Sequence, residues 1–308
     1  MQTRQTIGLR TAARDYETLV QQACNKVKGF SELYKEMDRS ISITGKSKST
    51  LTNYGRHLAS MALHYGCMPT ELVADQVMDY LHLVKANGSP SATYFKFTIY
   101  GLRFACKLRG LPYHQFSLPA IEKADKLPVV LSQTEVKQLL KACDLLKHRI
   151  LIGLIYGCGL RCAEVRKLAI RDADLQRGML HVRQGKGGKD RYVPLGKMLI
   201  RGIAQYLQAE KPQRWLFEGN LPGAYFSQRG TQWVISQAVK KAGIRKEVST
   251  HTLRHSYATH LLEQGLDIVT IKELLGHERI ETTMVYLHIA QPSARAAFSP
   301  LDTLYTQR

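Results

Sequence analysis

The second half of the chain carries residues that together could break a phosphodiester bond. They are two arginines, a lysine, two histidines and a tyrosine: Arg161, Lys186, His251, Arg254, His277 and Tyr286. Cleavage without a metal needs fixed positive charge at the non-bridging phosphate oxygens, and a planar guanidinium supplies it through paired hydrogen bonds. A tyrosine can attack the phosphorus, but its ordinary pKa of about 10 means that it needs a base or a positive field. The set therefore predicts a transesterification centre with no metal.

The other side chains could move the protons of such a reaction. Histidine has an ordinary pKa of about 6.5, so His251 is the natural general base. A lysine on a flexible hairpin can reach a phosphodiester and protonate its leaving oxygen. The glycine-rich turn 184–190 offers two such lysines, Lys186 and Lys189. His277 would hydrogen-bond a non-bridging oxygen.

Taken singly, these residues have ordinary explanations. A basic residue after a glycine turn is usually a solvated surface group. Tyr286 lies near Met284, Val285 and Ile289 and could be a core aromatic. The order and the chemical types of the whole set are what make the prediction specific.

The charge of the chain indicates a polyanionic partner. Lys and Arg number 44 against 25 Asp and Glu, which gives a net charge of +19 over 308 residues. Residues 1–125 carry 16 minus 10, or +6, and residues 126–308 carry 28 minus 15, or +13. Because both halves are basic, we expect both to touch a phosphate backbone, that of double-stranded DNA.

Composition excludes several other classes of protein. The hydrophobic fraction of 44% is that of a globular chain, and the longest apolar run, Ile150–Leu160, has 11 residues and cannot span a membrane. The start, Met1–Tyr16, has no apolar segment typical of a secretory signal. Six cysteines without paired spacing favour a reducing compartment. We therefore expect a cytoplasmic, nucleoid-associated protein.

Apolar periodicity predicts a mainly α fold with a small β-sheet. Helices are expected near 49–65, 70–85 and 91–109, before a proline-flanked linker at 117–128. Ser132 and Glu135 fit a capping box that opens the second domain. Two strands are expected at 179–183 and 191–195, and the rest of that domain reads as helical.

A basic, hydroxyl-rich segment precedes the first of these helices. Lys46, Lys48, Ser49 and Thr50 are candidate DNA-phosphate contacts at a helix N-terminus. A solvated helix cap is the equal alternative. A nucleotide-binding P-loop is excluded, because Ser40 stands where its first glycine is required.

The order Arg161, Lys186, His251-x-x-Arg254, His277 and Tyr286 resembles the tyrosine recombinases of the phage-integrase family, which include Xer-type resolvases and integron integrases. The resemblance implies a helical (SAM-like) core-binding domain at 1–120, with core helices at about 46–110. It implies a mixed α/β catalytic domain with a C-terminal tail at 126–308, the two forming a clamp around DNA. The lysine directly after Gly185, Lys186, matches the active position, and Glu164 matches a supporting acidic position.

The resemblance also implies a mechanism and an assembly. Attack by Tyr286 would give a 3′-phosphotyrosyl bond and a free 5′-hydroxyl, with no cofactor and no ATP. Four protomers would assemble on two DNA sites, with the tail packing in trans, and accessory DNA-bending proteins could take part. The 65 residues from Lys186 to His251 leave no room for the integron-integrase insertion. An N-terminal stretch of about 45 residues favours a mobile-element integrase over the alternative, a Xer-like dimer resolvase.

Three other interpretations compete. His251, His255 and His260 could be metal ligands on one helix, but Arg254 beside them would repel a cation. Residues 267–286 resemble a helix-turn-helix, as in a non-catalytic DNA-binding regulator, yet a regulator has no need of the basic set. A type IB topoisomerase would use similar chemistry, but the spacing and compact size favour recombination.

Overall fold

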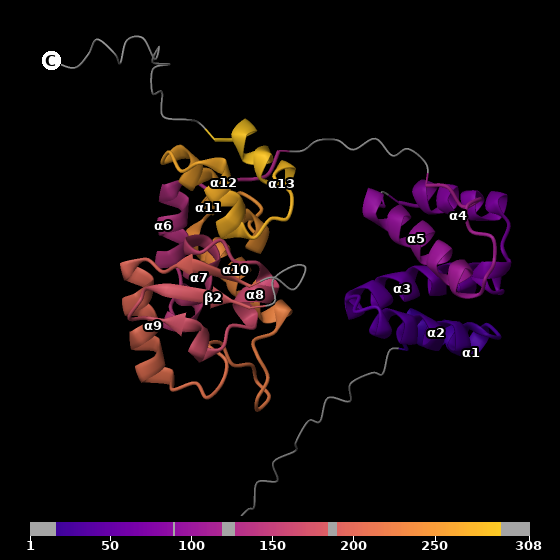
Figure 1. Cartoon of the computed structure of the whole chain (residues 1–308), viewed down its shortest axis with the longest axis horizontal. Helices are drawn as coiled ribbons and strands as arrows, with labels where there is room; N and C mark the ends of the chain where they lie inside the picture. Colours follow the sequence, from indigo (N-terminus) through magenta and orange to yellow (C-terminus); the bar gives the residue numbers. More distant parts are fainter. Residues whose placement is uncertain (1–16, 89, 119–126, 184–189, 291–308) are drawn as a thin grey trace, which may run out of the picture. The chain divides into compact units, whose positions relative to one another are not determined.

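The computed structural model describes residues 17–88, 90–118, 127–183 and 190–290. The chain divides into two compact units, Met1–Ala124 and Asp125–Arg308, here called the N-terminal unit and the C-terminal unit (Figure 1). The mainly α fold with a small β-sheet is confirmed. Among the described residues, no helix is both long and apolar enough to cross a membrane.

All secondary-structure elements among the described residues of the N-terminal unit are helices. Its elements are α1 (Leu19–Lys26), α2 (Phe30–Ile43), α3 (Lys48–Tyr65), η1 (Pro69–Glu71), α4 (Ala74–Ala86) and α5 (Ala92–Leu108). Helix α3 packs against α1, α2 and α5 and forms the centre of the unit (Figure 1). The helices expected at 49–65 and 91–109 are present within one residue at each end, and the expected 70–85 helix is split into η1 and α4.

The helical core begins earlier than the sequence analysis expects. The apolar side chains of α2 recur at steps of three and four and are buried against α3: Phe30, Leu33, Met37 and Ile41. Helix α1 packs against α2 and α3. The stretch before residue 46 therefore belongs to the same hydrophobic core, and its helical periodicity was the signal that could have shown this.

The C-terminal unit combines helices with a small antiparallel sheet. Its elements are α6 (Gln133–Lys141), α7 (Leu146–Gly157), α8 (Cys162–Arg166), η2 (Ile170–Asp172), β1 (Ala173–Asp174), β2 (Met179–Val182), β3 (Arg191–Pro194), α9 (Lys197–Glu210), α10 (Gln228–Ala242), α11 (Thr250–Glu263), α12 (Ile268–Leu275), α13 (Glu281–Met284) and η3 (Val285–His288). The sheet order is β1-β2-β3, with Leu180 opposite Val193. Both expected strands are present, whereas β1 was missed because two residues show no periodicity.

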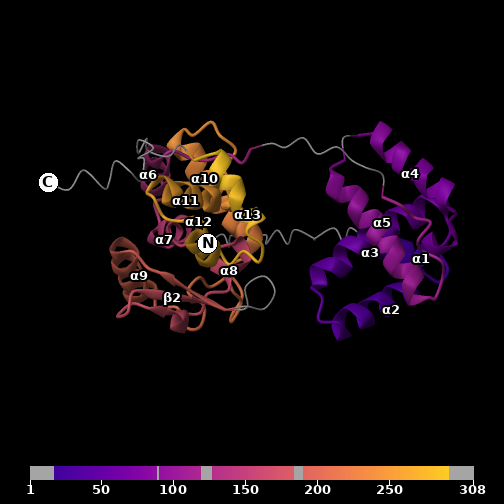
Figure 2. The ribbon, with the colours of Figure 1, turned by 45° about the horizontal axis from the view of Figure 1, so that its top comes forward.

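Buried apolar residues of α7 form the middle of this unit. Ile152, Leu154 and Ile155 are fully buried, and α7 contacts α9 and α11. The predicted capping box at the start of α6 is confirmed: the Ser132 hydroxyl accepts from the Glu135 amide, and the Glu135 carboxylate accepts from the Ser132 amide. Helices α11, α12 and α13 gather at one end of the unit, away from α9 and β2 (Figure 2).

Candidate active site

A buried carboxylate, Glu164, organises the basic residues of the C-terminal unit. Its side chain is 4% exposed, and it accepts hydrogen bonds from Arg161 Nη1 at 2.7 Å and from both terminal nitrogens of Arg191, while Arg254 Nη1 lies 3.9 Å away. Burial opposes ionisation, but Arg191 and Arg161 outweigh it and lower the Glu164 pKa to about 2. Three guanidinium groups thus share one negative charge, which leaves this group of four side chains strongly positive.

Arg161 is held at the N-cap of the short helix α8. Its backbone N–H donates to Glu164, and its Nη2 donates to the Gly276 carbonyl at 3.1 Å. A guanidinium has five N–H groups, so two side-chain bonds leave three that are unused among the described residues. The side chain is 21% exposed. Arg161 is therefore both fixed in position and open to an anion.

Arg254 lies on α11 and is buried deeper than Arg161. It donates from Nη1 to the Gly159 carbonyl and from Nη2 to the Leu275 carbonyl. Burial, together with the charge of Arg161, lowers the Arg254 pKa to about 10, so the group stays protonated at neutral pH. Backbone carbonyls, rather than a second carboxylate, hold this cation, and its charge remains available to a phosphate.

Two glycines in the left-handed region shape this basic centre. Gly159 has φ +59° and Gly276 has φ +62°, and their carbonyls accept from Arg254 and Arg161 respectively. A Cβ at Gly159 would lie 2.5 Å from the Tyr257 ring, and one at Gly276 would lie 3.1 Å from Arg191. The positive φ favours glycine at both places, and at Gly159 the close approach of Tyr257 also leaves no room for a Cβ.

Tyr286 lies on η3 with its side chain almost wholly buried, 1% exposed. Its hydroxyl is 3.0 Å from Nδ1 of His255 on α11. Burial raises the Tyr286 pKa, while the charges of Arg254 and Arg161 oppose that rise. The predicted nucleophile and the two arginines are therefore neighbours in space, although more than 30 residues separate them along the chain.

The other predicted site residues differ in their placement. His277 follows the left-handed C-cap of α12, its Nδ1 lies 2.9 Å from the Thr283 hydroxyl, and burial with Arg254 lowers its pKa to about 3. His251 is exposed in the first turn of α11 and, within the described residues, makes no side-chain hydrogen bond to Tyr286. Lys186 and its rival Lys189 lie outside the described residues.

Sequence reasoning missed two participants in this arrangement, Arg191 and His255. Arg191 was considered only as the first residue of the expected strand at 191–195, and its ion pair with Glu164 joins β3 to α8 across 27 positions of the chain. His255 was considered only as a metal ligand. Its position one helical turn after His251 was a signal that both could face the same site.

No metal centre is formed by the described residues: nowhere among them do three His, Cys, Asp or Glu side chains gather as ligands would.

The cysteines flanking Arg161 behave as packing groups. Cys158 is fully buried and burial raises its pKa to about 12, while Cys162 is half-buried.

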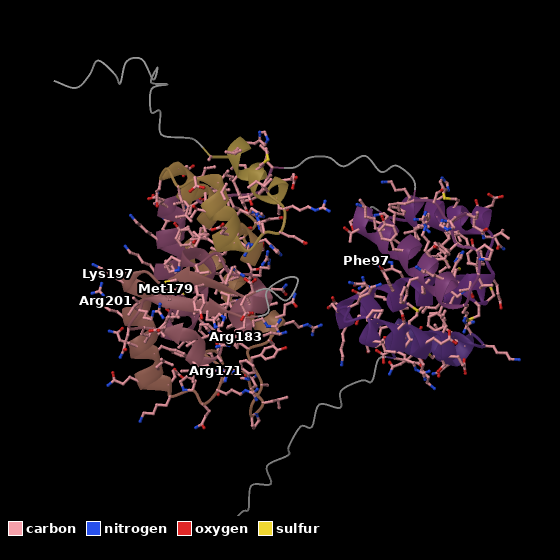
Figure 3. All side chains as sticks on the ribbon, in the orientation of Figure 1. Phe97, Arg171, Met179, Arg183, Lys197 and Arg201 are labelled. Atoms are coloured by element: carbon pink, nitrogen blue, oxygen red, sulfur yellow. The ribbon has the colours of Figure 1, made fainter. Side chains whose placement is uncertain are left out.

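The candidate DNA contacts of the N-terminal unit lie at the start of α3. Ser47 caps the helix, Lys48 and Ser49 are exposed, and Thr50 is half-buried. The Lys46 ammonium lies 5.1 Å from the centroid of the Phe104 ring of α5. Half-buried Phe97, also on α5, lies at the rim of the unit (Figure 3). Of these candidates, Lys46 thus lies beside a partly exposed aromatic ring.

The sequence of the C-terminal unit matches a known protein family. Residues 129–292 match the phage integrase family. The tyrosine recombinase XerA of Pyrococcus horikoshii is 32% identical over 279 residues, which cover 90% of this chain and 95% of that protein. The tyrosine recombinase XerD of Staphylococcus epidermidis is 37% identical over 224 residues, which cover 64% of this chain and 74% of that protein.

Solved structures share the fold. A XerH site-specific recombinase bound to a palindromic difH substrate superposes with a TM-score of 0.67 at 22% identity, covering 89% of this chain and 90% of that chain. The Tn1549 transposon integrase in complex with transposon right end DNA gives 0.65 at 16% identity, covering 82% and 94%. Because the sequence identities to these two structures are low, the similarity establishes a shared fold and nothing more.

Proposed function

Because the chain belongs to the phage integrase family, whose tyrosine recombinases cleave and rejoin DNA, we propose that it is a site-specific recombinase acting through a 3′-phosphotyrosyl intermediate at Tyr286. The observation that carries the proposal is the buried Tyr286 hydroxyl beside Arg161 and Arg254, whose charges oppose the rise in its pKa. A positive field of this kind stabilises both the phenolate and a phosphate in attack.

The reaction uses two exchanges at phosphorus. In the first, the Tyr286 hydroxyl loses its proton and attacks, an Oη–P bond forms, and the P–O5′ bond breaks. The leaving 5′ oxygen takes a proton from Lys186. In the second, a 5′-hydroxyl of the partner strand gives its proton to Lys186 and attacks the phosphorus. A P–O5′ bond forms, the Oη–P bond breaks, and the released Tyr286 oxygen takes back the proton that it lost in the first exchange. The covalent bond conserves the phosphodiester energy, so neither ATP nor a metal ion is required.

The basic side chains have separate roles in this scheme. Arg161 and Arg254 hold the non-bridging oxygens, and His251 and His277 complete the ring of hydrogen-bond donors. Glu164 touches no substrate. It is a positioning residue, because it fixes Arg161 through both the backbone N–H and the guanidinium.

DNA contact extends to the N-terminal unit, where Lys46, Lys48, Ser49 and Thr50 would meet backbone phosphates. Strand exchange between two sites requires four protomers, and the segment after Ala290 would pack onto a neighbouring protomer. Accessory DNA-bending proteins could aid the assembly. Deleting the residues after Ala290 is expected to abolish pairing of two sites in a gel-shift assay while single-site binding remains; a truncated chain that still pairs sites would contradict the trans arrangement.

Two biological roles fit this chemistry, service to a mobile element and Xer-like dimer resolution. The length of the N-terminal stretch no longer favours the mobile element, since α1 and α2 belong to the helical core. Alignments with relatives named XerA and with a relative named integrase/recombinase cover nearly the whole chain alike, so the relatives do not separate the two roles. The DNA that the protein recombines distinguishes the two roles. Recombination at the end of an element would indicate a mobile-element integrase, and recombination at a site on the host chromosome or plasmid would indicate a dimer resolvase.

The test is a covalent-adduct assay. Wild type and Tyr286→Phe are incubated with nicked duplexes tiled across the flanks of the gene and across replicon termini, and products are resolved under denaturing conditions. The wild type is expected to give a protein–DNA band that maps by peptide sequencing to Tyr286, and the variant none. A band that persists in Tyr286→Phe would overturn the assignment, and binding without any band on nicked, relaxed and supercoiled DNA would favour a regulator.

A further inference from the structure

The hydroxyl of Tyr286 lies within hydrogen-bond distance of His255. The sequence alone instead predicts His251 as the general base. We propose that His255 receives the phenolic proton of Tyr286 during strand cleavage and that His251 acts at the phosphate instead. This inference rests on the proposed function, because it assigns a role within the same site.

The geometry of the pair is that of a hydrogen bond ready for proton transfer. Nδ1 of His255 lies 3.0 Å from the Tyr286 oxygen, and the ring centroids are 5.6 Å apart. When its Nε2 carries the proton, the neutral imidazole can only accept at Nδ1, so the phenol donates. This distance is within the range that a general base needs, even before DNA arrives.

His251 is placed differently on the same helix. Its ring centroid is 6.4 Å from that of His255, and it lies in the exposed first turn of α11. Both histidines line a hollow of about 590 Å³ together with Glu247 and Ser249. His255 therefore contacts the buried phenol through Nδ1 and also lines an open space, which gives a proton taken up by the ring a route to solvent.

Charge around His255 makes the transfer depend on substrate. Burial, His251 and Arg254 lower its pKa to about 4, and His277 and Arg161 also lie in the same basic region. Without DNA, both phenol and imidazole stay neutral. A phosphodiester held by the arginines adds negative charge, which favours the imidazolium and so favours transfer. In this step the Oη–H bond of Tyr286 breaks and an Nδ1–H bond forms on His255. The electron pair left on the phenolate oxygen then forms the bond to phosphorus as the P–O5′ bond breaks.

The first experiment is chemical rescue. His255→Ala is expected to form adduct about 10²–10³-fold more slowly than wild type on the nicked duplex that gives the wild-type band, the range of a lost general base. Free imidazole can enter the adjoining hollow and should restore the rate. Among substituted imidazoles, the rate constant for rescue by the neutral form should rise with basicity, because the added molecule takes the proton. A merely structural histidine would show no such slope.

The chain offers a matched control. His260, also on α11, places Nδ1 2.9 Å from the Tyr156 hydroxyl. His260→Ala removes an equivalent bond outside the reacting groups, and added imidazole should leave its rate unchanged. A base-dependent rescue of His251→Ala, with none for His255→Ala, would identify His251 as the base and overturn the proposal.

A second variant guards against misfolding. His255→Asn keeps an acceptor near the phenol but cannot take up a proton, and its circular dichroism should match wild type. Its cleavage should remain slow on a duplex whose leaving 5′ oxygen is replaced by sulfur, because sulfur departs without a proton but the phenol must still lose one. Wild-type speed of His255→Asn on either duplex would overturn the proposal. Absence of any wild-type adduct would instead refute the proposed function.

Discussion

Arg191 and Glu164 form a two-pronged ion pair in the interior of the C-terminal unit. Arg191 Nη1 and Nη2 donate to the two carboxylate oxygens at 2.9 and 2.8 Å, and Nε donates to the Leu274 carbonyl at 2.8 Å. The first residue of β3 is thereby joined to α8 and to the end of α12.

Arg191→Ala should destabilise the fold by about 3–5 kcal/mol, because it leaves a buried carboxylate without its main partner. A lysine ammonium cannot form the two parallel hydrogen bonds that the guanidinium makes to the carboxylate, so Arg191→Lys should recover less than half of that loss in stability. The measurement is urea unfolding followed by circular dichroism. Lys241→Ala is the control, since its ion pair with Asp144 is exposed to solvent and should contribute little to stability. Equal losses in the two alanine variants would refute the role of Arg191.

The stability of the protein should depend on Glu164 in acid. Its pKa falls from the ordinary 4.5 to about 2 on folding, so the stabilisation is complete above about pH 4.5 and is lost as the pH falls towards 2. A shift of that size corresponds to roughly 3 kcal/mol. Urea unfolding of wild type and Glu164→Gln between pH 2.5 and pH 6 measures it. The glutamine variant should show a flatter pH dependence across this window, and parallel curves would contradict the assignment.

Arg161→Ala should affect cleavage far more than binding. Loss of one preorganised donor to a developing phosphate charge typically slows reaction about 10²–10³-fold, whereas DNA affinity spreads over many basic residues and should change less than about tenfold. Adduct kinetics and fluorescence anisotropy with one duplex measure both. The matched control is Arg171→Ala, an exposed arginine on η2 (Figure 3) that should leave cleavage unchanged. Wild-type cleavage by Arg161→Ala would show that the active site lies elsewhere.

Gly159 and Gly243 offer a paired test of why glycine is needed beside Arg254. Both have positive φ, but a Cβ at Gly159 would strike Tyr257 whereas one at Gly243 meets nothing within 4 Å. Gly243→Ala should cost about 1 kcal/mol from conformation. Gly159→Ala adds overpacking and should cost about 2–4 kcal/mol. Thermal unfolding of the two variants compares them, and equal costs would mean that Tyr257 moves aside freely.

Lys46 and Lys48 should each contribute one phosphate contact. Removing either by alanine is expected to reduce the slope of log affinity against log salt by about 1, with little change in sequence preference. Anisotropy titrations at several salt concentrations give the slope. Lys85, an exposed lysine on α4, is the comparison. If Lys85→Ala lowered the slope equally, the start of α3 would have no special place in DNA binding.

Local patterns were enough for most elements of the fold. The periodic apolar residues predicted α3 and α5, and Ser132 with Glu135 predicted the capped start of α6. These features depend on residues a few positions apart. The omission of α1 and α2 from the expected core was an error of reading, since the spacing of Phe30, Leu33 and Met37 was visible.

The residue types and order in the chain already indicated the family and nominated Arg161, Arg254 and Tyr286 as reacting groups. Which histidine meets the tyrosine, and which arginine holds Glu164, was decided by packing. His251 and His255 are one turn apart on α11, and only the seating of η3 against that helix brings His255 to the phenol. Arg191, the first residue of β3, reaches Glu164 on α8 and also the Leu274 carbonyl on α12. Contacts between residues 27 or 31 positions apart depend on how helices and strands pack, and spacing along the chain does not encode that distance.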